Sequence, residues 1–99
     1  MNERPIFYNL INNVPTICDR TEWRYHYTNR IVKQETVDGI FISTVFLGID
    51  HAWEGAPILF ETMIFGGEKD GFCDRCSTWE DAERMHDLIV AWLKKSLLD

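Results

Sequence analysis

The chain lacks long apolar runs and has little basic charge. No stretch approaches the roughly 18 to 20 continuous apolar residues that a membrane helix needs, and residues 1–5 do not resemble the start of a signal peptide. Ten lysines and arginines stand against sixteen acidic residues, which gives a net charge of −6. Without an apolar span or a signal peptide, we expect a cytoplasmic protein that does not enter a membrane. Because the negative charge repels phosphate backbones, we also expect no direct binding of nucleic acid.

The chain has three cysteines and six glycines, and few of them fall into recognised site patterns. Cys18, Cys73 and Cys76 form an odd set, so we expect reduced thiols rather than a disulfide framework. Residues 73–76 have the spacing Cys-x-x-Cys, but this pair stands alone, and on a strand its two thiols face opposite sides. No glycine belongs to a phosphate-binding pattern. The sequence therefore predicts no cofactor, and metal or redox use of the cysteines is the minor alternative.

The composition is that of an ordinary folded domain. Ninety-nine residues with 45% hydrophobic and 13% aromatic content are enough for one core but not for two. Residues 40–49 and 57–65 are apolar on both faces, which is typical of central strands. We therefore expect both faces of the sheet to be covered, the second by the N-terminal segment or by a second copy in a homodimer.

Turn signals connect these strands to two others. Asp38 and Gly39 favour a hairpin between strands 30–36 and 40–49. Asp70 and Gly71 favour a return into a short edge strand over residues 72–76. The expected sheet is a three- or four-stranded antiparallel meander.

Helical periodicity dominates residues 79–97. Ser77 and Thr78 each begin a capping-box pattern, and apolar residues follow at intervals of three and four. Before the sheet, residues 5–11 fit a short strand or an extended segment, and residues 19–28 fit a short helix. The fold class is therefore α+β, with the C-terminal helix packed on one face of the sheet. The predicted apolar stripe, into which His86 falls, comprises Ala82, Met85, Ile89, Trp92, Leu93 and Leu97.

Four ionisable residues are predicted to converge where strand 40–49 ends. Asp50 and His51 follow this strand, Glu61 lies in the next one, and His86 lies on the buried face of the helix. In a structural interpretation, His86 donates to Glu61 and Asp50 accepts turn amides. The alternatives are a polar pocket for a ligand, or an enzyme or metal site that uses His51, Glu61 and His86 with Asp50 orienting an imidazole.

The loop over residues 51–57 is the other candidate binding element. It carries Trp53, which is either an exposed anchor or a core residue, and the acidic Glu54. A large aromatic side chain in a short acidic loop suits capture of a partner.

Three ordered segments of the chain resemble a family of small uncharacterised phage and prophage proteins. They are residues 42–51, residues 58–67, and residues 78–83 together with His86. The resemblance implies a virus-encoded accessory protein in the bacterial host cytoplasm, and it carries no reaction. Cys73 and Cys76 depart from the family pattern. The residues that match its motifs include Asp50, His51, Glu61, Thr62 and His86.

These observations favour a binding protein that captures a host protein or small ligand, for example to inhibit a host antiviral defence. The competing hypotheses are a small metal-dependent or acid/base enzyme and, less favoured, a minor virion component. The predicted binding residues are Asp50, His51, Trp53, Glu54, Glu61, Thr62 and His86.

Overall fold

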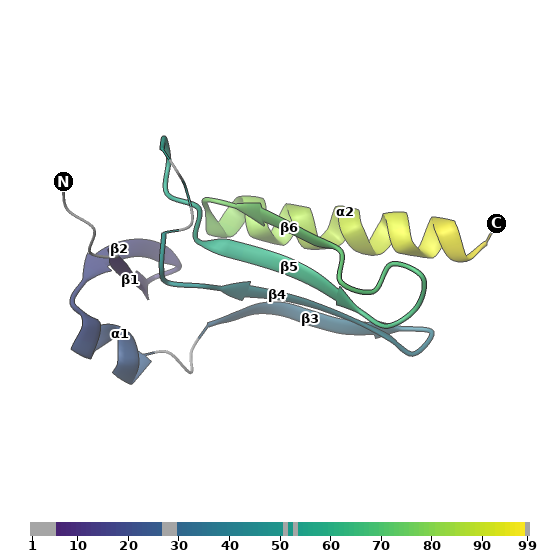
Figure 1. Cartoon of the computed structure of the whole chain (residues 1–99), viewed down its shortest axis with the longest axis horizontal. Helices are drawn as coiled ribbons and strands as arrows, with labels where there is room; N and C mark the ends of the chain where they lie inside the picture. The colour runs from purple at the N-terminus through teal and green to yellow at the C-terminus, as the bar shows by residue number, and fades with distance from the viewer. Residues whose placement is uncertain (1–5, 27–29, 51, 53, 99) are drawn as a thin grey trace.

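The protein has an α+β fold in which one long helix covers one face of a four-stranded antiparallel sheet (Figure 1). The computed structural model describes residues 6–26, 30–50, 52 and 54–98. The sheet has the order β3-β4-β5-β6, and a separate hairpin pairs β1 with β2. The elements are β1 Phe7–Ile11, β2 Val14–Cys18, α1 Arg20–His26, β3 Ile31–Val37, β4 Ile40–Phe46, β5 Phe60–Phe65, β6 Cys73–Cys76 and α2 Trp79–Leu97.

The predicted turns and caps set the boundaries of these elements. Asp38 and Gly39 have φ angles of 50° and 80°, as a two-residue hairpin turn of the I′ type requires. Thr78 caps α2 by accepting a hydrogen bond from the Asp81 N–H at 3.1 Å. The predicted hairpin, meander and C-terminal helix are therefore confirmed.

Helix α2 packs on alternate residues of the strands. Its buried side chains lie against Ile42, Ile64, Phe60 and their neighbours, which form two adjoining clusters of the core. The predicted stripe is wrong at Trp92 and Leu97, which are exposed, because they lie at the margin of the helix surface that meets the sheet. The buried residues of α2 are Ala82, Met85, His86, Ile89, Val90 and Leu93.

The N-terminal hairpin closes one end of the sheet (Figure 1). Asn12 and Asn13, with φ angles of 50° and 66°, make its turn, and β2, a strand that the sequence analysis does not predict, begins directly after it at Val14. Tyr8 is buried and donates its N–H to the Gly48 carbonyl at 2.8 Å. A Cβ at Gly48 would collide with Trp23, so this position also ties α1 to the hairpin.

The described N-terminal residues do not cover the face of the sheet that lies away from α2, and cover of that face by a second copy stays a prediction. On the side away from α2, Ile31, Phe41 and Phe65 are 55%, 37% and 46% exposed. Strand parity places every second residue on that side, and the described helices lie elsewhere (Figure 1). We call this side the open face, defined by Ile31, Gln34, Thr36, Phe41, Ser43, Val45, Glu61, Met63, Phe65, Cys73 and Arg75.

Helix α2 is long but carries charges along its length. Among the helices of the described chain, none has the length and apolar character that crossing a membrane requires.

Candidate functional site

Asp50 closes the loop that follows β4. Its Oδ1 atom accepts the N–H of Ala52 at 2.8 Å and the N–H of Ile58 at 3.0 Å, so one carboxylate oxygen holds both ends of the loop. This confirms the structural interpretation of Asp50 as an acceptor of turn amides. Strand β4 ends at Phe46, three residues earlier than predicted, because Gly48 adopts a φ angle of 76° that extended strands do not allow.

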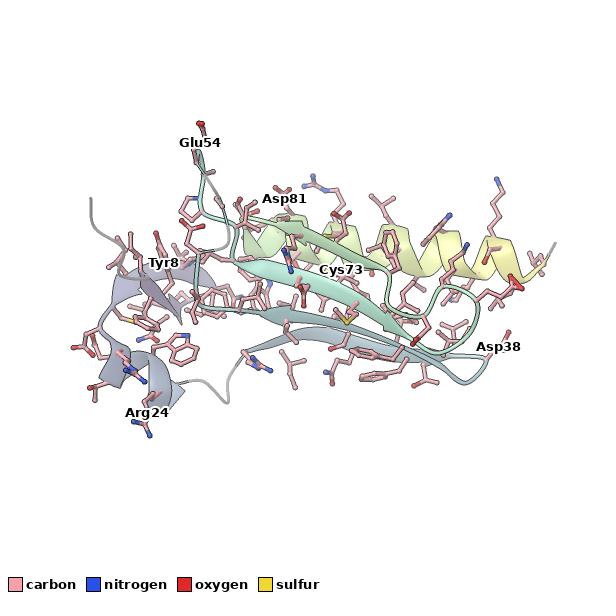
Figure 2. All side chains as sticks on the ribbon, viewed as in Figure 1. Tyr8, Arg24, Asp38, Glu54, Cys73 and Asp81 are labelled. Carbon is pink, nitrogen blue, oxygen red and sulfur yellow. The ribbon has the colours of Figure 1, made fainter. Side chains whose placement is uncertain are left out.

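The loop over residues 51–57 carries three of the predicted binding residues. His51 and Trp53 lie outside the residues that the structure describes. Glu54 is exposed at the loop tip and points away from the sheet (Figure 2). Its distance from the sheet means that Glu54 is available to a partner but does not join the other predicted site residues.

His86 is the centre of a buried polar network beneath α2. Its Nδ1 atom lies 2.7 Å from Thr44 Oγ1, and its Nε2 atom lies 2.9 Å from Glu35 Oε1. Thr44 Oγ1 is in turn 2.5 Å from Thr62 Oγ1. The predicted pairing of His86 with Glu61 is therefore wrong, and Glu35 on β3 takes that place.

The network satisfies its own hydrogen bonds. Because an ionised carboxylate only accepts hydrogen bonds, a neutral His86 donates its Nε2–H to Glu35, and its Nδ1 accepts a hydrogen bond from the Thr44 hydroxyl. Thr62 then donates to Thr44. Within the described part of the chain, no buried side-chain nitrogen or oxygen lacks a partner. The described buried side-chain nitrogens and oxygens of the network therefore all have partners within the protein.

The hydrogen-bonded series of Thr44, His86 and Glu35 resembles the arrangement of groups used in acid/base catalysis. However, Thr44, Thr62 and His86 are all fully buried. A reacting atom must come within about 3 Å of a general base, and here α2 and the sheet occupy that space. The arrangement therefore joins β3, β4, β5 and α2 rather than serving a substrate.

Glu61 lies on the open face, on the opposite side of the sheet from His86. Its Oε2 atom accepts the Arg75 Nε–H at 3.0 Å and the Cys73 thiol at 3.2 Å. Burial, followed by the hydrogen bond to Glu61, raises the pKa of the Cys73 thiol. The same carboxylate raises the pKa of Arg75, again mainly through its hydrogen bond. Glu61 therefore has local partners on β6.

The predicted convergence of Asp50, Glu61 and His86 is wrong. Asp50 closes a loop, Glu61 is on the open face and His86 is under α2, so only Thr62 and His86 belong to one cluster. Because Glu61 and His86 face opposite sides of the sheet, they cannot ligate one ion. No group of three histidine, cysteine or acidic residues in the described ranges is placed to hold a metal.

The open face exposes apolar side chains that no described element covers. The Phe41 and Phe65 rings lie 6.0 Å apart between centroids, and Val45 and Met63 are half-buried beside them. Among the strand residues of this face, the charged side chains are Glu61 and Arg75, which pair with each other. A protein with a net charge of −6 thus presents a neutral, partly aromatic surface here.

Sequence reasoning missed Glu35 and Thr44 as partners of His86. The Asp38-Gly39 turn contained the signal, since a two-residue hairpin pairs Val37 with Ile40 and hence Glu35 with Ile42. That register places Glu35 on the helix face of the sheet. Glu35 is then within reach of His86, which α2 places above the same face.

No protein-family model matches the chain, and neither a curated protein nor a solved structure is significantly similar to it.

Proposed function

We propose that this chain is a virus-encoded accessory protein that acts in the bacterial cytoplasm by binding a host protein through its open face. The observation that carries the proposal is the exposure of Ile31, Phe41 and Phe65 on a charge-neutral side of the sheet. Contiguous exposed apolar side chains mark interaction sites more often than they mark ordinary surface. The viral origin rests on the resemblance of the three sequence segments.

Binding is a better proposal than catalysis for a specific reason. The residues proposed for an enzyme are separated, with Glu61 on the open face and His86 buried beneath α2. Aromatic side chains on a rigid sheet, by contrast, are the usual anchors of protein interfaces. Inhibition of a host antiviral defence extends the proposal and rests on the viral resemblance.

A capture experiment with three variants tests the surface. We expect tagged wild-type protein to retain a host protein from bacterial lysate, and Phe65→Asp to lose it. Removing an interface anchor costs about 2 kcal/mol or more, or roughly thirtyfold in affinity. Leu97→Asp is the matched control, because Leu97 is 43% exposed on α2 and lies away from the open face.

Two results would redirect the proposal. If Glu54→Lys abolished capture while Phe65→Asp retained it, the loop over residues 50–57 would be the binding site. If light scattering showed a wild-type dimer that Phe65→Asp converted to a monomer, a second copy of the chain would be the occupant of the open face.

A further inference from the structure

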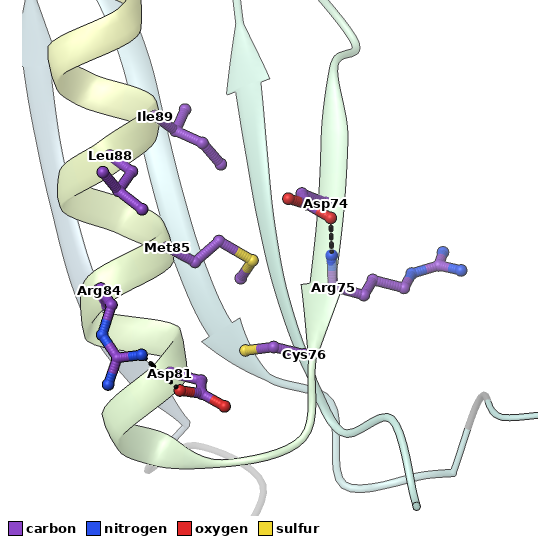
Figure 3. A pocket seen from close by; sticks show the side chains of 8 residues that line it. All are labelled: Asp74, Arg75, Cys76, Asp81, Arg84, Met85, Leu88 and Ile89. Atoms are coloured by element: carbon purple, nitrogen blue, oxygen red, sulfur yellow. Dashed lines mark hydrogen bonds and ion pairs between the residues drawn. The ribbon is translucent and has the colours of Figure 1, made fainter. Parts of the chain in front are cut away.

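A groove of about 300 Å³ runs between the edge strand β6 and helix α2 (Figure 3). Its floor is apolar, with Met85, Leu88 and Ile89 from the helix and Cys76 from the strand. Leu88 is 64% exposed even though it lines the groove. The groove therefore retains apolar surface that no described residue of the chain fills.

The backbone of β6 offers hydrogen bonds along this groove. Strand β6 is at the edge of the sheet, and the carbonyls of Phe72 and Cys76 accept N–H groups from the β5 side. Because ladder bonds alternate in an antiparallel pair, Cys73 and Arg75 direct their backbone groups outward. The Arg75 N–H meets only the adjacent Asp74 carboxylate, at 2.9 Å.

The side-chain charges at the groove favour a cationic partner. Asp74 points to the groove, whereas the Arg75 side chain points away and pairs with Glu61 at 3.0 Å (Figure 3). At the end of the groove, Asp81 is already paired with Arg84 at 3.1 Å. Among the described residues that line the groove, Asp74 is therefore the charged residue without an oppositely charged partner.

We propose that this groove binds an extended peptide of another protein, which adds to β6 as a fifth strand of the sheet. Residues two apart on a strand share a face, so the peptide carries a lysine or arginine opposite Asp74 and an apolar residue opposite Cys76. The apolar side chain then lies over Met85 and Leu88. This site is separate from the open face and does not depend on the function proposed for it.

A second copy of the chain is a poor occupant because of symmetry. A two-fold axis places one residue opposite its own copy, and the registers that pair three of the four β6 residues centre on Asp74 or on Arg75, so that two like charges lie directly opposite each other. Like charges directly opposite each other destabilise a strand pair. A peptide with its own sequence avoids this repulsion.

Titration of isotope-labelled full-length protein with two blocked synthetic peptides tests the proposal by NMR. The first peptide is built of threonine and serine with one leucine and one lysine two positions apart. The second has the same composition with leucine and lysine adjacent. We expect the first to shift the amide signals of Cys73, Arg75 and Leu88, and to bind about two- to fivefold more tightly than the second.

Charge reversal provides the sharper measurement. Asp74→Lys is expected to invert the preference, so that a peptide with glutamate in place of lysine binds better. Glu83→Lys makes the same change elsewhere on the exposed surface of α2 and should leave the preference intact. Leu88→Ser should weaken both peptides. Equal binding of the two peptides, an uninverted preference in Asp74→Lys, or peptide-free shifts of β6 signals with protein concentration would overturn the proposal.

Discussion

The two faces of the same four strands have opposite surroundings. On the helix face, Ile42, Thr44 and Ile64 are fully buried beneath α2, and the buried polar side chains described there have hydrogen-bond partners. On the open face, Phe41 and Phe65 are adjacent in the sheet and exposed. The strands have the same backbone and nearly the same apolar content on both sides. The comparison therefore teaches that apolar strand residues identify a central strand without identifying what covers each face.

The largest expected contrast is between two consecutive residues of β5. Ile64→Ala should lower the free energy of unfolding by about 2–5 kcal/mol, because it opens a cavity in the core. Phe65→Ala should cost only about 1 kcal/mol, because that side chain is already half exposed. Urea unfolding followed by circular dichroism measures both. Equal losses would mean that the open face is covered in solution.

The buried network gives the next contrast. His86→Leu should cost about 1–3 kcal/mol, since Glu35 and Thr44 each lose a hydrogen bond. Thr44→Val should cost less in the His86→Leu background than in the wild type, with a coupling of about 0.5 kcal/mol or more. Ser43→Ala, which removes a hydrogen bond to Gln34 on the open face, is the matched control and should cost less than about 1 kcal/mol. A coupling near zero would show that the network residues act independently.

The reactivity of two thiols, Cys76 on the helix face and Cys73 on the open face, provides a third comparison of the two faces of the sheet. Burial raises the pKa of Cys76, on the helix face, to about 11, so that roughly 0.3% of it is thiolate at pH 8.5. Cys73 on the open face also has a raised pKa, partly because of Glu61. Alkylation by iodoacetamide, followed by mass spectrometry, should be slowest at Cys76. Glu61→Gln should accelerate the reaction at Cys73 alone, and acceleration at both would contradict this assignment.

The smallest effect concerns an exposed ion pair between α2 and the edge of the sheet. The hydrogen bond between Lys33 Nζ and Asp87 Oδ1, at 2.7 Å, raises the pKa of Lys33 and lowers the pKa of Asp87. The stability that Asp87 contributes to the folded protein is present above the ordinary pKa of this carboxyl and is lost as pH falls through the lowered pKa. The stability that Lys33 contributes is present below the ordinary pKa of this amine and is lost as pH rises through the raised pKa.

Because both side chains are largely exposed, solvent screening keeps the effect of this pair on stability slight, and NMR is the suitable measurement. Lys33→Met should return the pKa of Asp87 toward its ordinary range. Lys69→Met, which removes a cation stacked on Trp92 instead, should leave that pKa unchanged. A shift of similar size in both variants would show that general charge, rather than the pair, controls Asp87.

Local signals predict much of the fold. The turn at Asp38 and Gly39 and the cap at Thr78 act over three or four residues, so the sequence suffices to place them. Strand β2 was missed because Pro15 interrupts its pattern, although Asn12 and Asn13 favour the turn that forms it. Contacts between side chains of different helices and strands, in contrast, depend on how these elements pack against one another.

The candidate site illustrates that dependence. Glu61 and Thr62 are neighbours in sequence but lie on opposite faces, so a shift of one residue in the register exchanges their environments. The partner of His86 depends on where α2 crosses β3, which no local pattern specifies. Exposure of Phe41 and Phe65 depends on where the described helices and the N-terminal hairpin lie, and the alternation of residues along a strand does not encode that.

The two hydrogen bonds that Asp50 accepts should let the loop between Ala52 and Ile58 tolerate insertions. One carboxylate oxygen of Asp50 accepts the N–H groups of both Ala52 and Ile58. These hydrogen bonds fix the two ends of the loop relative to the sheet, whatever the length of the segment between them. Gly55 stands in open space, with no atom near the position of a Cβ. Because the entropy of closing a loop grows slowly with its length, extra residues at Gly55 should fold with the rest of the protein. This position is therefore a natural place for an epitope or a fluorescent label.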